Sequence, residues 1–415
     1  MSASRNNPPN VSLNQQPDGQ ECPSYKAKSL AIFAVVQLLV VSVCGAAWWI
    51  RPAAEDHSRR EPVLLNQPAT VGPKYNVVEV VSDKQLAHVL GKLRPRFKNA
   101  KPKINHVDHA LRCWGAEVEF ADSRFISGAE MRRLLTDHEA FKSAWGEQTR
   151  PLLLSKAQGV AVRTQQGDAT ASHVDHTLAT LAECGTPLDL PIRLAGRSAT
   201  LRDVMQQALA SFEINQHEYE WTVLALALYV QDGQPWFTAE GDRLDFDRLV
   251  HRVTRQRYGQ GVCYGNHRLY SLTILLRLDD EKKLLSPAAR QDVVAHLAEA
   301  TKRLAANQHA DGYWDRNWFD LKVEAKDEDL VLGGPLARRI LATGHALEWW
   351  AMVPEGLQTQ LQPTRDVVVK ASQWLVREIE QMDEKTVDAN YTFLSHAGRA
   401  LALWRGTVPA MVTTE

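Results

Sequence analysis

The 415-residue sequence carries almost no net charge. Its 48 Lys and Arg residues oppose 49 Asp and Glu residues, which gives a formal charge of -1. No dense run of basic residues alternates with aromatic ones. Proteins that bind nucleic acid carry a basic patch or stripe as their electrostatic footprint. We therefore expect no nucleic-acid partner.

Cysteine is scarce and unpaired along the chain. The five cysteines are Cys22, Cys44, Cys113, Cys184 and Cys263, and none belongs to a C-x-x-C pair. An odd, widely spaced set gives no disulfide framework. Buried free thiols are the simplest interpretation, and a metal site shared with histidine is the alternative.

Charged residues are also absent from residues 29–50, which read SLAIFAVVQLLVVSVCGAAWWI. A helix of these 22 residues is about 33 Å long, enough to cross the hydrocarbon core of a bilayer. Trp48 and Trp49 close it like an interfacial belt. The segment is longer than a signal-peptide core and no clean A-x-A site follows, so an uncleaved transmembrane anchor is predicted.

The anchor divides the chain. We expect a disordered tail over 1–28, the anchor over 29–50, a proline-containing linker over 51–73, a folded domain over 74–406 and a short tail over 407–415. The lipid bilayer is then the expected partner. Basic residues flank both ends of the anchor, so their count does not decide its orientation. The short tail and large domain favour a single-pass protein with the domain outside the cytoplasm, although its free thiols argue against an oxidising compartment.

Hydrophobic periodicity predicts an all-α domain with two kinds of helix. Segments 286–308 and 361–382 have one apolar face each, and Ser286-Pro287 is a typical helix start. Segments 221–230 and 269–278 are apolar on nearly every face. A helix of the second kind must be surrounded by other helices, so two concentric layers are predicted.

A short repeat marks the inner layer. His106-Val107-Asp108-His109-Ala110-Leu111 returns as His173-Val174-Asp175-His176-Thr177-Leu178. Such self-similarity indicates a repeat architecture. Histidines stand at comparable expected helix starts in six places: His109, His176, His217, His267, His345 and His396. We predict an α/α toroid of about six helical hairpins, with these histidines at one end of the ring. An open, HEAT-like solenoid is the alternative.

One motif carries a resemblance. Gln308-His309-Ala310-Asp311-Gly312-Tyr313-Trp314 matches Q-x-x-D-G-x-W. It resembles the QW repeat of the terpenoid cyclases and related prenyltransferase-type toroids. The resemblance implies a structural role, in which the motif ends an outer helix and ties it to the next inner one. The D-x-D-D signature of the squalene-type cyclases is missing.

A second stretch is a candidate for chemistry. Gly344-His345-Ala346-Leu347-Glu348-Trp349 is similar to the G-H-x-x-E-W stretch of the N-acylglucosamine 2-epimerase family, also α/α toroids. That resemblance implies that His345 is a general base beside a sugar. On a helix, His345 and Glu348 share a face. A histidine that only packs or caps an inner helix is the alternative.

The remaining candidate site residues would act together only if the inner helices bring them to one end of the ring. His109, His176 and His267 would join His345 and Glu348 if the inner helices run parallel, with Asp108, Asp175 and Glu218 nearby. Cys263 and His267 are four residues apart and would face one zinc ion on a helix, but surrounding glycines also suit a loop. The sequence names no cofactor.

Two functions remain open. The first is an enzyme that acts on a carbohydrate or lipid-like small molecule in the toroid by His/Glu acid–base chemistry. The second is a non-catalytic binding or scaffolding toroid tethered to the membrane.

Overall fold

The computed structural model describes residues 31–42, 61–97, 101–164, 167–216, 218–238, 240–322 and 334–412. The chain forms two compact units, Met1–Ser58 and Arg59–Glu415. Within the first unit, residues 31–42 are helical. Among the described residues, no helix is long and apolar enough to cross a membrane. The other residues of the expected anchor, 29–30 and 43–50, lie outside that description.

The second unit is mostly helical, so the predicted all-α class is confirmed. Six helices are buried on nearly every side: α3 (Ile104–Trp114), α6 (His176–Glu183), α8 (Glu220–Tyr229), α10 (Asn266–Lys282), α12 (Gly334–Ala351) and α16 (Tyr391–Trp404). Around them lie α2 (Asp83–Lys92), α4 (Gly128–Thr136), α5 (His138–Trp145), α7 (Leu201–Ser211), α9 (Phe246–Thr254), α11 (Pro287–Ala306), α13 (Gln358–Leu361), α14 (Arg365–Gln381) and α15 (Glu384–Ala389).

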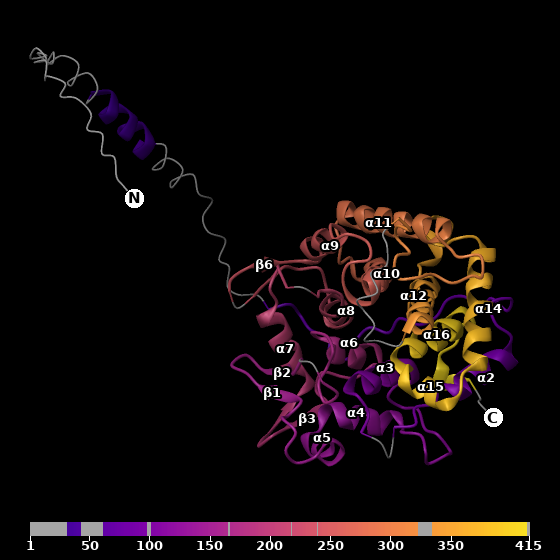
Figure 1. Ribbon diagram of the computed structural model, residues 1–415. Helices are drawn as coiled ribbons and strands as arrows, with labels where there is room; N and C mark the ends of the chain where they lie inside the picture. The colour runs from indigo at the N-terminus through magenta and orange to yellow at the C-terminus, as the bar shows by residue number, and fades with distance from the viewer. Residues whose placement is uncertain are drawn as a thin grey trace, which may run out of the picture. The chain divides into compact units, whose positions relative to one another are not determined.

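The buried helices contact one another in a cyclic order. α3 contacts α6, and contacts continue through α8, α10, α12 and α16. α16 in turn packs against α3, so the series closes on itself in space (Figure 1). All ten residues of α8 are buried, as its apolar faces predict. We call these six helices the inner helices.

The surrounding helices have one wet face. α11 buries Val293, Leu297, Ala300 and Leu304, the predicted stripe, and contacts α10. Its start is also as predicted, since the Ser286 side chain accepts a hydrogen bond from the backbone of Ala289. α14 covers α12 and α2, and α4 covers α3. The amphipathic segments therefore form an outer layer over the apolar ones.

Short antiparallel hairpins decorate the connections between helices, and the sequence patterns did not predict them. The pairs are β1 (Leu153–Ser155) with β2 (Val160–Val162), β3 (Pro191–Leu194) with β4 (Arg197–Thr200), and β5 (Trp236–Phe237) with β6 (Arg243–Leu244). At two to four residues per strand, they are too short to give a clear period-two pattern.

The Q-x-x-D-G-x-W motif follows the end of α11. Gln308 Nε2 donates to the carbonyl oxygens of Gly312 and Val367, each at 2.9 Å, and Val367 belongs to α14. The backbone N–H of Trp314 donates to Thr343 Oγ1 on α12 at 3.0 Å. Trp314 Nε1 donates to the Leu304 carbonyl at 2.8 Å, and its indole is buried. The motif thus joins the end of α11 to α14 in the outer layer and to α12 among the inner helices.

The expected helix starts were wrong for several marker histidines. His176 and His267 lie at the starts of α6 and α10, but His109, His345 and His396 lie inside their helices. α12 begins at Gly334, so Gly344 lies inside this helix and not at its start. A residue without a side chain is needed at position 344 because α16 passes close by. A Cβ at Gly344 would lie 2.8 Å from the backbone nitrogen of Ala397. The glycine therefore marks a close helix crossing and not a helix boundary.

Candidate active site at the centre of the inner helices

Five of the marker histidines meet at the centre of the ring. They contact one another and Trp221 in a closed cycle of side chains, one from each inner helix. We call His109, His176, Trp221, His267, His345 and His396 the central cluster. Successive ring centroids lie 4.7, 4.2, 4.2, 4.3 and 3.7 Å apart in that order, and the cycle closes at 5.0 Å between His396 and His109. His217 lies outside the described residues, and Trp221 of α8 takes the remaining place.

The imidazoles of the central cluster are neutral at neutral pH. Each of the six residues of the cluster is at most 3% exposed. Burial, reinforced by the neighbouring imidazoles, lowers the pKa of His396 to about 3 and that of His109 well below its usual value. His109 Nδ1 lies 2.7 Å from the carbonyl oxygen of Asn105, so Nδ1 carries the proton.

Glu348 lies beside two of these imidazoles. Its Oε2 forms a hydrogen bond with His396 Nδ1 at 3.0 Å and lies 3.2 Å from His345 Nδ1. A carboxylate accepts hydrogen bonds, so it favours the His396 tautomer that carries the proton on Nδ1. Nε2 of His396 and both ring nitrogens of His345 are buried without a hydrogen-bond partner among the described residues. The centre of the ring therefore contains nitrogen atoms that a ligand could engage.

Glu348 is ionised because two arginines oppose its burial. Arg112 Nη1 lies 2.7 Å from its Oε1, and Arg399 donates to the same oxygen. Burial alone would raise the pKa of Glu348, but these arginines bring its pKa well below the usual range. Its side chain is completely buried.

A second carboxylate balances the charge of the arginines. Glu183 Oε2 lies 2.6 Å from Arg112 Nε, and Glu183 Oε1 lies 3.1 Å from Arg399 Nη2. The Tyr270 hydroxyl also donates to Glu183. Two guanidinium groups and two carboxylates thus form a neutral network beside the central cluster. Such a network is tolerated in a low-dielectric interior because every charge has an opposite partner.

The acidic residues expected near the ring take separate partners. Asp108 Oδ2 accepts from Thr177 Oγ1 at 2.9 Å and lies 3.6 Å from His176 Nδ1. Asp175 Oδ2 accepts from Thr222 Oγ1 at 2.6 Å. Glu218 pairs with His173 at 3.0 Å. Asp108 therefore lies beside the central cluster, whereas Glu218 engages the first histidine of the second repeat.

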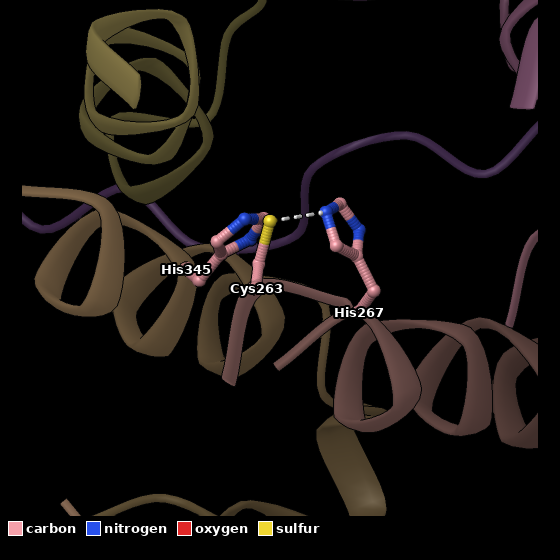
Figure 2. A group of neighbouring side chains, drawn as sticks. All are labelled: Cys263, His267 and His345. Carbon is pink, nitrogen blue, oxygen red and sulfur yellow. Dashed lines mark hydrogen bonds between the residues drawn. The ribbon is translucent and has the colours of Figure 1, made fainter. Parts of the chain in front are cut away.

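The turn before α10 brings a thiol to the cluster. Cys263 and Tyr264 both adopt left-handed backbone conformations, with φ of 49° and 59°. This turn places Cys263 Sγ 3.1 Å from His267 Nε2, and the side chain projects between His267 and His345 (Figure 2). Ligand atoms of these three residues all lie within 4.8 Å of one another. Burial raises the pKa of the Cys263 thiol, which is therefore protonated when no cation is nearby.

The predicted site residues are thus brought together, and their partners were missed. The five predicted catalytic residues, His109, His176, His267, His345 and Glu348, lie in or against the central cluster. Arg112, Arg399 and Glu183 were not predicted. A signal was present for Glu183 and Arg399, since each is a charged residue on a mainly apolar helix, where an unpaired charge is costly.

Comparison of the chain with family models, with curated proteins and with solved structures finds no match.

Proposed function

We propose that residues 74–406 form an α/α toroid, with the inner helices as its barrel and the amphipathic helices as its outer layer. The cyclic contact order supports this proposal, because in an open solenoid the first and last inner helices would lie far apart. The position of Gln308–Trp314 between α11, α12 and α14 also fits the QW-type linkage of the cyclase and prenyltransferase toroids.

The toroid is proposed to be an enzyme that performs acid–base chemistry on a carbohydrate or lipid-like small molecule. The observation that carries this is the convergence of five imidazoles in one cluster, two of which lie within 3.2 Å of the ionised Glu348. Neutral imidazole is the usual proton acceptor at physiological pH. The Glu348 carboxylate lies beside Nδ1 of both rings and would stabilise the cation formed when Nε2 takes a proton. Either His345 or His396 can act in this way, with His109, His176 and His267 around them.

Substrate would approach from the end of the ring where α6 and α10 begin. Residues 167–175 and 255–265 immediately precede these helices, and His173 and Cys263 of these segments contact His176 and His267 of the central cluster. Cys263, in the second segment, is partly exposed. Movement of these connections would open the cluster to a small molecule, as loops do at many enzyme sites.

Deuterium exchange tests the acid–base proposal. A base that removes a proton from a carbon next to, or conjugated with, a carbonyl group exchanges it with solvent, so the full-length protein in D₂O should label C2 of N-acetylmannosamine or the γ position of farnesal. Proton NMR follows the loss of signal. His345→Ala and Glu348→Gln should lower the exchange rate about 100-fold or more. His88→Ala, on the exposed side of α2, is the control and should exchange like the parent protein.

Failure to label either probe, in protein whose circular dichroism shows it folded, would overturn the acid–base proposal for both substrate classes. Equal loss in His88→Ala would overturn the assignment to the central cluster.

A binding or scaffolding toroid is the second candidate. Complete burial of His345 and Glu348 favours it, because sealed polar groups can specify a unique core without meeting a substrate. In that case substitutions in the central cluster would lower thermal stability, and no exchange would be seen with any variant.

Residues 29–50 are proposed to anchor the domain in a lipid bilayer, with the domain outside the cytoplasm. The support is a run of 22 residues without charge. The full-length chain should stay with membranes after carbonate extraction, and a chain lacking 29–50 should be released. Protease added to intact cells should then degrade the domain. Release of the full-length chain by carbonate would exclude the anchor, and protection from protease would reverse the orientation.

A further inference from the structure

A thiol lies among the imidazoles of the central cluster. Cys263 Sγ lies 3.1 Å from His267 Nε2, and the ligand atoms of Cys263, His267 and His345 all lie within 4.8 Å of one another. In tetrahedral zinc sites with Zn–S of about 2.3 Å and Zn–N of about 2.0 Å, ligand atoms are separated by about 3.5 Å. The three donors therefore surround a volume of the size that one such ion requires.

The backbone of the turn before α10 adopts a strained conformation that places the Cys263 thiol in this position. Left-handed conformations at two consecutive non-glycine residues, Cys263 and Tyr264, cost roughly 1–3 kcal/mol each. Gly261 also has a positive φ, of 93°, and a Cβ there would lie 2.6 Å from Glu220 Oε1. Such strain persists only where the surroundings impose it, and it concentrates at functional sites.

Buried side chains impose this conformation. Arg268 Nη2 donates to the Gln260 carbonyl at 2.6 Å, and Asn266 Nδ2 donates to the Cys263 carbonyl at 3.1 Å. Trp318 Nε1 donates to the Tyr264 carbonyl at 3.0 Å. Three side-chain donors thus fix the carbonyls of Gln260, Cys263 and Tyr264, and with them the position of the thiol.

One imidazole of the donor set has a carboxylate on its outer side. A ligating histidine usually gives its other ring N–H to a carboxylate, which fixes the tautomer and makes the ligating nitrogen more basic. Glu348 is within reach of this role for His345, because its Oε2 lies 3.2 Å from Nδ1. Both ring nitrogens of His345 are buried without a hydrogen-bond partner among the described residues. An unpartnered buried nitrogen of this kind is costly unless a ligand satisfies it.

We propose that Cys263, His267 and His345 bind one transition-metal ion, with Zn²⁺ as the expected occupant. Thiolate and imidazole together select borderline ions such as zinc over Mg²⁺ or Ca²⁺, which prefer oxygen. Both imidazoles are buried and Cys263 is only partly exposed, so the ion would enter through movement of the turn before α10. Three protein ligands leave a fourth position, which water occupies in catalytic zinc sites.

Metal binding would also divide the roles within the proposed active site. His345 would serve the metal, and His396, held by the same Glu348 oxygen, would be the imidazole that remains for proton transfer. The metal proposal stands without the acid–base proposal, because a structural zinc needs the same three ligands.

Metal titration of the full-length protein in detergent tests the proposal. After chelation, the parent protein should bind one Zn²⁺ per chain, measured by elemental mass spectrometry. Co²⁺ in its place should give tetrahedral visible bands and a thiolate-to-cobalt charge-transfer band in the near ultraviolet. Cys263→Ser should abolish that charge-transfer band, and His345→Ala should weaken the affinity 100-fold or more.

Cys184→Ser is the matched control. Cys184 is also partly exposed, but its thiol donates to the Leu111 carbonyl at 3.2 Å and belongs to no group of potential metal ligands among the described residues. This variant should bind cobalt like the parent protein. If the ligand variants do not fold, the parent cobalt spectrum decides alone. A stoichiometry near zero, a spectrum without the thiolate band, or an equal loss in Cys184→Ser would overturn the proposal.

The two proposals fail differently. One tightly bound metal ion without deuterium exchange would support the metal site and overturn the enzyme. Deuterium exchange that survives complete chelation, in protein that binds no metal, would support the enzyme and overturn the metal site.

Discussion

The two histidines of each repeated motif have different environments. The second ones, His109 and His176, lie in the central cluster. The first ones do not: His106 packs near Phe97 and Tyr391, and His173 pairs with Glu218. The repeat predicted that both copies occupy equivalent places, because equal spacing on two helices gives equal orientation. It could not predict the partners, which come from distant parts of the chain.

The partners of Glu348 illustrate this limit. Arg112 is 236 residues away in the sequence, and Arg399 is 51 residues away. A single sequence contains no signal that pairs such positions. Patterns within one helix, such as His345 with Glu348 at i and i+3, were within reach because helix geometry alone places them together.

Asp108 provides a prediction at the residue scale. Burial raises the pKa of its carboxyl to about 7, although the Thr177 hydrogen bond opposes this. The folded protein therefore binds a proton that the unfolded chain releases above its usual pKa of 3.8. This contribution to stability is full below pH 3.8, declines as the pH rises, and is gone above about pH 7. Asp108→Asn should remove the dependence, because an amide stays neutral and still accepts from Thr177.

The measurement is the free energy of unfolding of both proteins from urea titrations at pH 5 and pH 8. The variant should gain stability relative to the parent between these values, by up to about 4 kcal/mol over the whole transition. The neighbouring His176 stays neutral in this range because burial holds its pKa well below the usual value. A difference that does not change with pH would show that the carboxyl is already ionised at pH 5.

Among the elements, the turn before α10 differs most from its expected form. A helical i, i+4 spacing and a glycine-rich loop were both open for Cys263 and His267. The structure places them together through a left-handed turn, and the helix begins only at Asn266. No sequence pattern predicts two left-handed non-glycine residues, since local preference opposes them. Contacts from Arg268 and Trp318 decide the conformation instead.

The crossing of α12 with α16 gives a prediction at the element scale. In Gly344→Ala, the new methyl group would lie 2.8 Å from the Ala397 nitrogen and 3.0 Å from its Cα. Backbone cannot move aside as a side chain can, so the helices must separate. We expect a loss of about 1–3 kcal/mol in the free energy of unfolding.

Gly91→Ala is the opposite case. Gly91 lies in the last turn of α2, and a Cβ there meets nothing within 4 Å. Replacing it should stabilise the protein by up to about 1 kcal/mol through helix propensity. Urea titration of both variants checks the pair. Equal effects of the same sign would mean that propensity, and not the close crossing, governs Gly344.

At the scale of the whole molecule, the sequence predicted which helices lie in the inner layer. It did not predict how far along each helix the central cluster lies. Apolarity on all faces identified α8 and α10 as buried, because only surrounding helices can cover such surfaces. Where each helix begins relative to the central cluster depends on tertiary packing. α12 begins eleven residues before His345, whereas α10 begins one residue before His267. Markers at one level in space therefore need not mark helix starts in the sequence.

Closure of the ring distinguishes the toroid from an open solenoid. A chain ended after Met382 lacks α15 and α16, so the surfaces of α3 and α12 that face α16 would lose their cover. Glu348 and Glu183 would also lose Arg399, which leaves buried charge without its partner. We expect the whole domain to unfold, with a loss of helical circular dichroism far beyond the share of the removed residues. A solenoid would lose only its last repeat, because each repeat contacts its neighbours alone.

A chain ended after Thr407 is the control: it lacks the short turn Pro409–Met411 but keeps α16, and it should remain folded. A proportional loss of signal in the shorter chain would favour the solenoid, since the remaining inner helices would then fold without closure.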